Sequence, residues 1–259
     1  MQVNSIKTYN TNITSFKSCV RKYPAGYGCN SGIKKGQVLT STSLFRDDLD
    51  WKFLRDLIIN NFKDKKQINT YCLACSDGSE AYSYVISLMD KLPEKEYIKY
   101  FPIMASDTDY ESIRAANTGR INLGLSDFMR MKENVKSFDY FIDKGKPINI
   151  SNNKNFAGYF YNSYKPINKL KNAVIFNQSD LLKEIKLIKD DGNSVIMARN
   201  VALYLKNDYI EEIAKTAGKI LKKGSLFITG ECDAQKSYLI EELVKNGFEE
   251  IKPLILRKK

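Results

Sequence analysis

Short apolar runs alternate with amphipathic stretches through most of the chain. The apolar runs have the length of buried strands, and the amphipathic stretches gather their apolar side chains on one side of a helix. The pattern predicts strands over residues 69–75, 100–105, 173–176, 194–198 and 225–230. It predicts helices over residues 80–92, 208–221 and 238–245. Such alternation is typical of an α/β domain built on a parallel sheet.

The two ends of this region depart from simple alternation. Before the first strand, apolar residues at helical spacing predict a helix from Ser43, capped by Ser43 and with Asp47 and Asp48 near its positive end. At the other end, residues 248–251 and 254–257 have the pattern of a hairpin. Such a hairpin would add an antiparallel strand to an otherwise parallel sheet.

In the middle of the chain the alternation stops over residues 120–171, a stretch rich in Asn, Lys, Tyr and Phe. This stretch is too long for a simple connection in a compact domain. Its aromatic runs at 138–141 and 159–161 suit short antiparallel strands. We therefore expect a small inserted subdomain within one domain over residues 41–259, preceded by an irregular arm over residues 1–40.

Composition excludes several classes of protein. At 259 residues, 43% of them hydrophobic, the chain can bury a substantial core. It has no apolar run of the roughly 20 residues that cross a membrane, and its polar start lacks a signal-peptide core. We therefore expect a cytoplasmic protein without membrane insertion. The sequence contains no histidine, which excludes the commonest general base and the His-activated nucleophiles.

The cysteines and the net charge bear on whether the protein binds a metal and on the kind of partner it has. Cys72 and Cys75 lie in an apolar run without a second pair to complete a zinc site, which favours a buried reduced pair and no bound metal. The net charge of +11 indicates an acidic partner. Its lysines are dispersed rather than interleaved with aromatic residues, so attraction to an acidic protein surface explains the charge as well as nucleic acid does.

The candidate chemistry lies where the first two strands end. Residues 75–83, Cys-Ser-Asp-Gly-Ser-Glu-Ala-Tyr-Ser, form a small-residue turn between the first strand and its helix. Asp107 and Asp109 follow the second strand. In a parallel sheet both segments lie at the same edge, where acidic residues accept hydrogen bonds from a ribose. The pattern predicts a nucleotide-like cofactor across the strand ends.

Five segments together resemble the CheR-type chemotaxis receptor methyltransferases, in the order and with the spacing of that family. They are residues 44–47, 75–83, 105–109, 115–119 and 198–204. The resemblance implies a Rossmann-like, S-adenosylmethionine-dependent methyltransferase sheet with a small inserted antiparallel β subdomain. It implies a protein-glutamate O-methyltransferase that acts on an acidic, methyl-accepting receptor and releases S-adenosylhomocysteine.

The resemblance also assigns residues to the cofactor site. They are Thr42, Arg46, Glu80, Asp107, Asp109, Asp180, Leu181, Asn200 and Val201. Arg46 would hold the methionine carboxylate and orient the substrate carboxylate, which makes it the candidate catalytic residue.

Several of these residues have structural alternatives. Arg46 could pair with Asp47 or Asp50 at the surface. Glu80 could be an ordinary acid in the first turn of a helix. Either Asp107 or Asp109 could cap the helix that starts at Tyr110 while the other binds ribose.

Asp180 could likewise cap a helix rather than accept a hydrogen bond from adenine.

Two departures from the family keep other functions open. The family's Ser-Thr-Gly-Glu-Glu-Pro-Tyr-Ser is here Ser-Asp-Gly-Ser-Glu-Ala-Tyr-Ser, which lacks the first acid and the proline. Residues 1–40 are shorter than the helical domain that the family carries there. One alternative is therefore a methyltransferase-like module that binds without turnover. Another is a nucleic-acid methyltransferase, although residues 199–202 lack the Asn-Pro-Pro-aromatic signature of base amino-group methylases.

Overall fold

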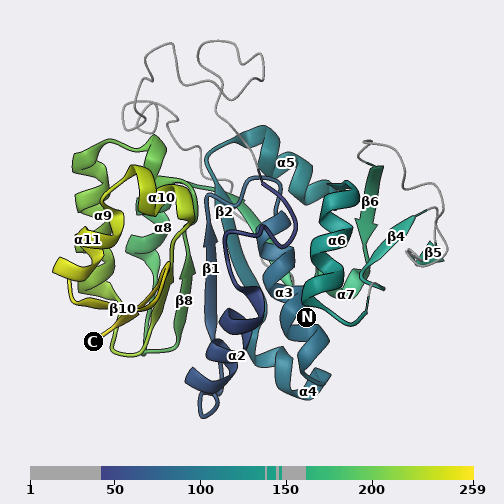
Figure 1. The fold of residues 1–259 in the computed structure, drawn as a ribbon, viewed down its shortest axis with the longest axis horizontal. Coiled ribbons are helices and arrows are strands. Elements are labelled where there is room, and N and C mark those ends of the chain that lie inside the picture. Colours follow the sequence, from purple (N-terminus) through teal and green to yellow (C-terminus); the bar gives the residue numbers. More distant parts are fainter. Residues whose placement is uncertain (1–41, 138, 144–145, 148–161) are drawn as a thin grey trace, which may run out of the picture.

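The computed structural model describes residues 42–137, 139–143, 146–147 and 162–259. At its centre lies a seven-stranded sheet in the order β10-β11-β9-β8-β1-β2-β7 (Figure 1). The predicted parallel strands are β1 (Asn69–Leu73), β2 (Ile103–Asp107), β7 (Val174–Gln178), β8 (Ser194–Met197) and β9 (Leu226–Ile228). The terminal hairpin, β10 (Phe248–Lys252) and β11 (Ile255–Lys258), joins β9 in antiparallel orientation. The predicted fold class is confirmed.

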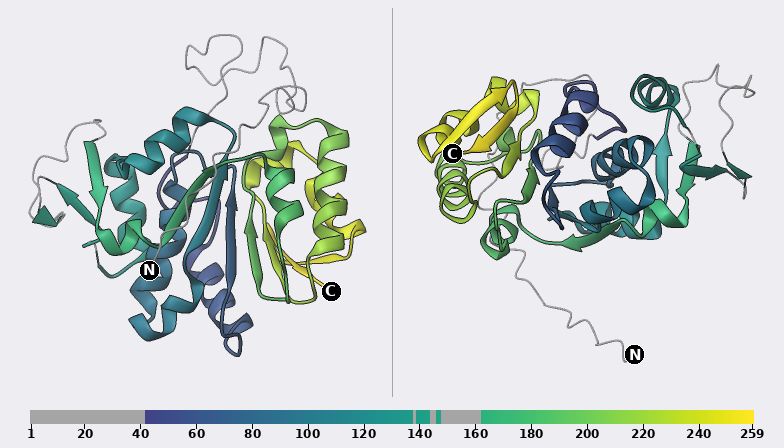
Figure 2. Two further views of the ribbon diagram at one scale, coloured as in Figure 1. Left: turned by 180° about the vertical axis from the view of Figure 1, so that it is seen from behind. Right: turned by 90° about the horizontal axis from the view of Figure 1, so that it is seen from below.

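Helices cover both faces of this sheet (Figure 2). One face packs against α2 (Trp51–Asn61) and α3 (Ser79–Lys91), and the other against α8 (Leu181–Leu187), α9 (Asn207–Ile220) and α11 (Leu239–Lys245). Successive strand residues point to opposite faces, so Val195 and Met197 join one core while Ile196 joins the other. This division explains why β8 and β9, which have helices on both faces, are buried along their whole length.

Further helices and 3₁₀ turns lie in the connections between these elements. They are α4 (Glu94–Tyr97), a 3₁₀ turn (Ile98–Tyr100), α5 (Tyr110–Thr118), α7 (Asn168–Lys171), a second 3₁₀ turn (Ala202–Tyr204) and α10 (Glu231–Lys236). Among the described residues, no helix is both long and apolar enough to cross a bilayer.

A four-stranded antiparallel sheet lies at the end of the molecule opposite the terminal hairpin (Figure 1). Its strands are β3 (Ile121–Leu123), β6 (Asn162–Pro166), β4 (Phe141–Asp143) and β5 (Lys146–Pro147), and α6 (Leu125–Asn134) packs beside them. Phe128 of α6 meets Tyr164 of β6 edge to face, with ring centroids 5.5 Å apart. The small antiparallel β unit of the predicted fold is thus present; the expected strand at 159–161 and the arm at 1–40 lie outside the described residues.

The segment before β1 differs from the sequence prediction. The helix begins at Trp51 instead of Ser43, and Asp50 caps it by accepting a hydrogen bond from the Phe53 N–H at 2.9 Å. Upstream, the Leu44 N–H donates to Asp127 at 3.0 Å and the Phe45 N–H donates to the Ser83 hydroxyl at 2.7 Å. Phe45 also has a φ of +49°, outside the right-handed helical region, and residues 42–50 form an irregular loop.

Candidate active site

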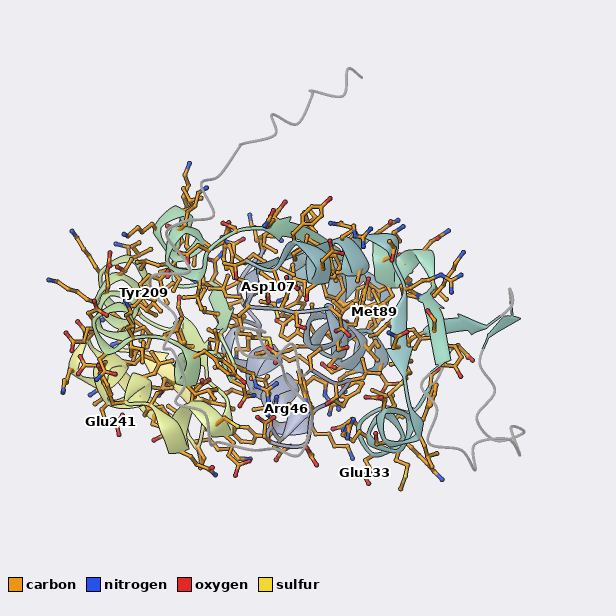
Figure 3. The ribbon with its side chains drawn as sticks, turned by 90° about the horizontal axis from the view of Figure 1, so that it is seen from above. Arg46, Met89, Asp107, Glu133, Tyr209 and Glu241 are labelled. Atoms are coloured by element: carbon orange, nitrogen blue, oxygen red, sulfur yellow. The ribbon has the colours of Figure 1, made fainter. Side chains whose placement is uncertain are left out.

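The predicted site residues come from loops at the carboxyl ends of β1, β2, β7 and β8 and from the loop 42–50. Figure 3 shows Arg46 and Asp107 on this side of the molecule. The two residues lie 61 positions apart in the sequence, Arg46 in the loop 42–50 and Asp107 at the end of β2. The parallel order of the strands brings their ends to one edge of the sheet, as expected for a ligand site of this fold.

The turn after β1 is fixed by Gly78. Its φ is +87°, and a Cβ at this position would lie 2.6 Å from the Phe176 ring. Only glycine adopts this conformation without strain and fits this contact. Asp77 then accepts hydrogen bonds from the Ser79 N–H at 2.9 Å and the Ser79 hydroxyl at 2.7 Å. The turn therefore delivers Glu80 into the first turn of α3.

Asp107 and Asp109 have different roles in the structure. Asp107 accepts hydrogen bonds from the N–H groups of Ser76, at 2.8 Å, and Asp109, at 2.9 Å. It thus joins the loops after β1 and β2, and burial raises its pKa. Asp109 caps α5 by accepting from the N–H and hydroxyl of Ser112, at 3.0 and 2.6 Å. The capping role belongs to Asp109, which leaves Asp107 as the candidate ribose ligand.

Asp180 takes the structural role that the sequence allowed. It caps α8 by accepting from the Lys183 N–H at 3.1 Å, and it also accepts from the Tyr209 hydroxyl at 2.5 Å. This second bond turns the carboxylate towards α9. Leu181, the first residue of α8, is buried in the core beside it. Contact of Asp180 and Leu181 with adenine remains a prediction.

A buried arginine that sequence reasoning did not assign lies at the end of β8. The Arg199 guanidinium is 0% exposed. It donates to Glu80 at 2.8 Å and to the Asp48 carboxylate, and it lies over the Trp51 ring, 5.4 Å from the centroid. Burial raises the pKa of Glu80 although the charge of Arg199 opposes that shift. The position of Arg199 next to Asn200 in the strand-end motif was the available signal.

Arg46 and Asn200 converge on the same acid, Asp48. The Arg46 Nε lies 3.5 Å from Asp48 Oδ2, and the Asn200 side-chain amide donates to that oxygen at 2.9 Å. Arg46 is 28% exposed, and its Nη2 lies 3.8 Å from the Cys232 sulfur. The ion pair of Arg46 is thus with Asp48 rather than with either of the two neighbours considered from sequence. Half-buried Val201 follows Asn200.

The structure joins some of the predicted residues and separates others. Arg46, Glu80 and Asn200 meet through Asp48 and Arg199. Among the described residues, Asp107, Asp109 and Asp180 share no hydrogen bond with that cluster. Half-buried Thr42 is the first described residue and lies in the same loop as Arg46.

Asp233 supports the turn that presents Asn200. It is fully buried and accepts hydrogen bonds from the N–H groups of Asn200 at 2.5 Å, Ala202 at 2.7 Å and Gly230 at 3.0 Å. Burial raises the pKa of Asp233 to about 6. Asn200 has a φ of +56°, which costs free energy for a residue with a side chain. The three backbone bonds to Asp233 hold this turn in place.

Buried hydroxyl groups at the strand ends fit a nucleoside ligand. The hydroxyls of Ser76, Ser106 and Ser179 are buried and find no hydrogen-bond partner within the part of the chain that the structure describes. They belong to the ends of β1, β2 and β7, on either side of Asp107. Buried polar groups are normally paired. Together with the carboxylate of Asp107 and the guanidinium of Arg46, they provide a donor and acceptor set suited to a nucleoside with an amino-acid end.

Cys72 of β1 and Cys75 of the following turn belong to the core. Cys72 and Cys75 are free and buried, and burial raises the pKa of both thiols well above the ordinary value. The Cys72 thiol donates to Glu80 at 3.6 Å. Within the described ranges, no three Cys, Asp or Glu side chains are arranged to hold a metal ion.

Comparisons with known proteins identify a family that this chain matches. Residues 40–243 match the model of the CheR methyltransferase, SAM-binding domain. The chain is 25% identical, over 167 residues, to chemotaxis protein methyltransferase 2 of Vibrio cholerae serotype O1. The alignment covers 64% of this chain and 51% of that protein, so this chain spans about half the length of the curated relative.

Solved structures show only distant likeness. A S-adenosylmethionine-dependent methyltransferase from Clostridium acetobutylicum is 14% identical, with 72% of this chain and 52% of that chain covered and a TM-score of 0.33. Precorrin-6y C5,15-methyltransferase from Geobacter metallireducens is 9% identical, with 80% and 77% covered and a TM-score of 0.38. These values add nothing to the family match.

The family match extends over the five parallel strands of the sheet, the loop of Arg46 and the strand end that carries Arg199 and Asn200. It includes the turn at Gly78 and the acid Asp107, whose geometry suits a nucleoside. The cofactor of the domain is S-adenosylmethionine, and the chain belongs to the CheR methyltransferase family.

Proposed function

We propose that this protein transfers the methyl group of S-adenosylmethionine to glutamate carboxylates of a chemoreceptor-like protein. One observation carries the proposal: Arg46, Glu80 and Asn200, which come from three distant family motifs, meet in one buried cluster at the carboxyl edge of the sheet. The name of the Vibrio cholerae relative, a chemotaxis protein methyltransferase, supports the substrate class.

The proposed cofactor contacts follow the charges of the site. Arg46 receives the methionine carboxylate, because a guanidinium can bind a carboxylate through two parallel hydrogen bonds, and Thr42 lies in the same loop. Asp107 accepts from the ribose hydroxyls. Asn200 and Val201 line the reacting end, with Glu80 beside them. Asp180 and Leu181 flank the adenine.

The chemistry suits a chain without histidine. The cofactor supplies an electrophilic methyl group on a positively charged sulfur. An oxygen of the substrate carboxylate attacks that carbon in line, the carbon–sulfur bond breaks, and its electron pair stays on sulfur, which leaves a methyl ester and S-adenosylhomocysteine. A glutamate side chain has a pKa of about 4.3 and is already ionised at pH 7. No proton has to be removed, so no general base is required.

The protein contributes position and environment to this reaction. Arg46 lies at the boundary between the buried cluster and solvent, with 28% of its side chain exposed, where it can orient an incoming carboxylate. Holding the two reactants in line and removing water from the carboxylate are each worth several kcal/mol. The net charge of +11 attracts an acidic protein substrate.

The test is transfer of radiolabelled methyl from S-adenosylmethionine to the cytoplasmic domain of a methyl-accepting receptor. We expect label that alkali releases as methanol, because methyl esters hydrolyse in alkali. A receptor with its methyl-accepting glutamates changed to alanine, and the Arg46→Ala enzyme, should stay unlabelled. Alkali-stable label, or label in RNA or DNA offered in parallel, would contradict the proposal.

A second candidate function is a module that binds the cofactor without turnover. It is favoured by Ser79, which stands where the family has its first acid and whose hydroxyl donates to Asp77 at 2.7 Å. Cofactor binding without transfer to any carboxylate acceptor would support this candidate.

A further inference from the structure

Asp48 connects three of the predicted cofactor residues. One of its oxygens, Oδ2, accepts from the Asn200 amide at 2.9 Å and lies 3.5 Å from the Arg46 Nε. The other, Oδ1, accepts from Arg199, which in turn donates to Glu80 at 2.8 Å. A single carboxylate therefore touches Arg46 and Asn200 directly and reaches Glu80 through one guanidinium.

The loop that carries Asp48 is fixed on its other side. The Leu44 N–H donates to Asp127 at 3.0 Å, and its carbonyl accepts from Arg130 at 3.0 Å. The Phe45 N–H donates to Ser83 at 2.7 Å. The Asp48 side chain is 6% exposed. Its carboxylate also accepts from the Arg199 guanidinium and from the Glu231 N–H, at 3.4 Å, so Asp48 has partners besides Arg46 and Asn200 and can set their orientation.

The contacts with Asp48 restrict the orientation of the Arg46 and Asn200 side chains. The Arg46 guanidinium is a rigid plane with contacts at two of its nitrogens: Asp48 Oδ2 lies 3.5 Å from Nε, and the Cys232 sulfur lies 3.8 Å from Nη2. The Asn200 amide is held at both ends, because its oxygen accepts from the Cys232 N–H at 3.1 Å while its nitrogen donates to Asp48. Loss of the Asp48 charge would release both side chains from their common partner.

We infer that Asp48 is a positioning residue for the amino-acid end of the cofactor. It holds the Arg46 guanidinium and the Asn200 amide in the orientation in which they receive that end. The inference rests on the proposed role of Arg46 as the carboxylate ligand. Asp48 itself acts through these two side chains and touches no reacting atom.

The test compares two ligands that differ only at that end. S-adenosylhomocysteine carries the amino-acid group, and 5′-methylthioadenosine lacks it. In calorimetric titrations, Asp48→Asn should bind S-adenosylhomocysteine weaker by about tenfold or more, while 5′-methylthioadenosine binds as it does to the unchanged protein. The control is Asp47→Asn, which removes the same charge from an exposed neighbour and should leave both affinities unchanged.

A general loss of structure would weaken both ligands equally, and that result would overturn the inference, as would unchanged binding of S-adenosylhomocysteine. A double-mutant cycle gives a second readout that is sensitive to the route of the effect. In an Arg46→Ala background, Asp48→Asn should weaken S-adenosylhomocysteine much less than it does alone. Fully additive losses would show that Asp48 does not act through Arg46. No methyl acceptor is present in these titrations, so failure of the methyl-transfer proposal would leave them interpretable.

Discussion

The charged residues on the two sides of the site have different kinds of partner. On the β2 side, Asp107 and Asp109 accept hydrogen bonds chiefly from backbone N–H groups of the neighbouring loops and of α5. On the β8 side, Asp48, Glu80 and Arg199 are held by one another, although 151 residues separate Asp48 from Arg199. The first arrangement depends on backbone geometry and the second on mutual charge.

This difference determines how much stability each side loses when one of its charged residues is replaced. Loss of one acid on the β2 side leaves backbone N–H groups without their acceptor, but it leaves no opposing charge buried and unpaired. On the β8 side, each charge compensates another away from water. Removal of one leaves its partners buried and unpaired, which costs several times more than the pair itself contributes.

Arg199→Met should produce the largest effect. It leaves the buried carboxylate of Glu80 without its cation and Asp48 with only the more distant Arg46, and we expect the free energy of unfolding to fall by about 3–5 kcal/mol. Urea denaturation measures this. The control is Arg114→Met, which breaks an exposed pair with Glu111 and should cost under about 0.5 kcal/mol. A loss as small as that of the control would contradict the contrast between the two sides.

The same variant should recover partly in acid. Burial raises the pKa of Glu80, so lowering the pH neutralises the carboxylate that Arg199 no longer compensates. The stability difference between the unchanged protein and Arg199→Met should shrink as the pH falls. A difference that stays constant would show that lost packing, rather than charge, explains the destabilisation.

Asp233 should make the free energy of unfolding depend on pH, with an effect of intermediate size. Its pKa is about 6 in the folded protein and near 3.8 when unfolded, so the folded state binds this proton more tightly. Its contribution to stability is therefore fully present at low pH and is lost as the pH rises from about 4 to 6, by up to about 3 kcal/mol.

Asp233→Asn removes this titration, and the stability of the unchanged protein minus that of the variant should fall with pH in this window. Chemical denaturation across the pH range measures both curves. A flat difference would mean that Asp233 titrates normally.

The smallest effects should come from the β2 side, and they should separate two neighbouring acids. Asp109→Ala removes the cap of α5 and should lower the free energy of unfolding by about 1 kcal/mol without changing cofactor affinity. Asp107→Ala should weaken S-adenosylhomocysteine by about tenfold or more. Calorimetry and thermal denaturation of both variants measure these quantities. An affinity loss in Asp109→Ala alone would reverse the assignment.

Much of the fold was predictable because its signals are local. The short apolar runs gave the strands of the parallel sheet within a few residues, and the terminal hairpin was predicted from its pattern. The predicted start of helix α2 at Ser43 was wrong. Hydrogen bonds from the Leu44 N–H to Asp127 and from the Phe45 N–H to Ser83 override the capping potential of Ser43. Such competition between distant residues leaves no trace in a local window.

For the site, the sequence predicted the residues of the motifs but not the residues that join them. The motifs pointed to Arg46, Glu80 and Asn200, and the structure brings these three together. The residues that join them, Asp48 and Arg199, were not assigned, because their pairing depends on how the loop 42–50 meets the end of β8. Their roles towards the cofactor remain predictions.

The central claim is that Arg46 receives the amino-acid end of S-adenosylmethionine at the carboxyl edge of the sheet. Calorimetric titration of S-adenosylhomocysteine into the unchanged protein, Arg46→Ala and the surface control Arg114→Ala tests it most directly. The account predicts binding that weakens by about tenfold or more in Arg46→Ala and stays unchanged in the control. Equal affinity in all three proteins would contradict it.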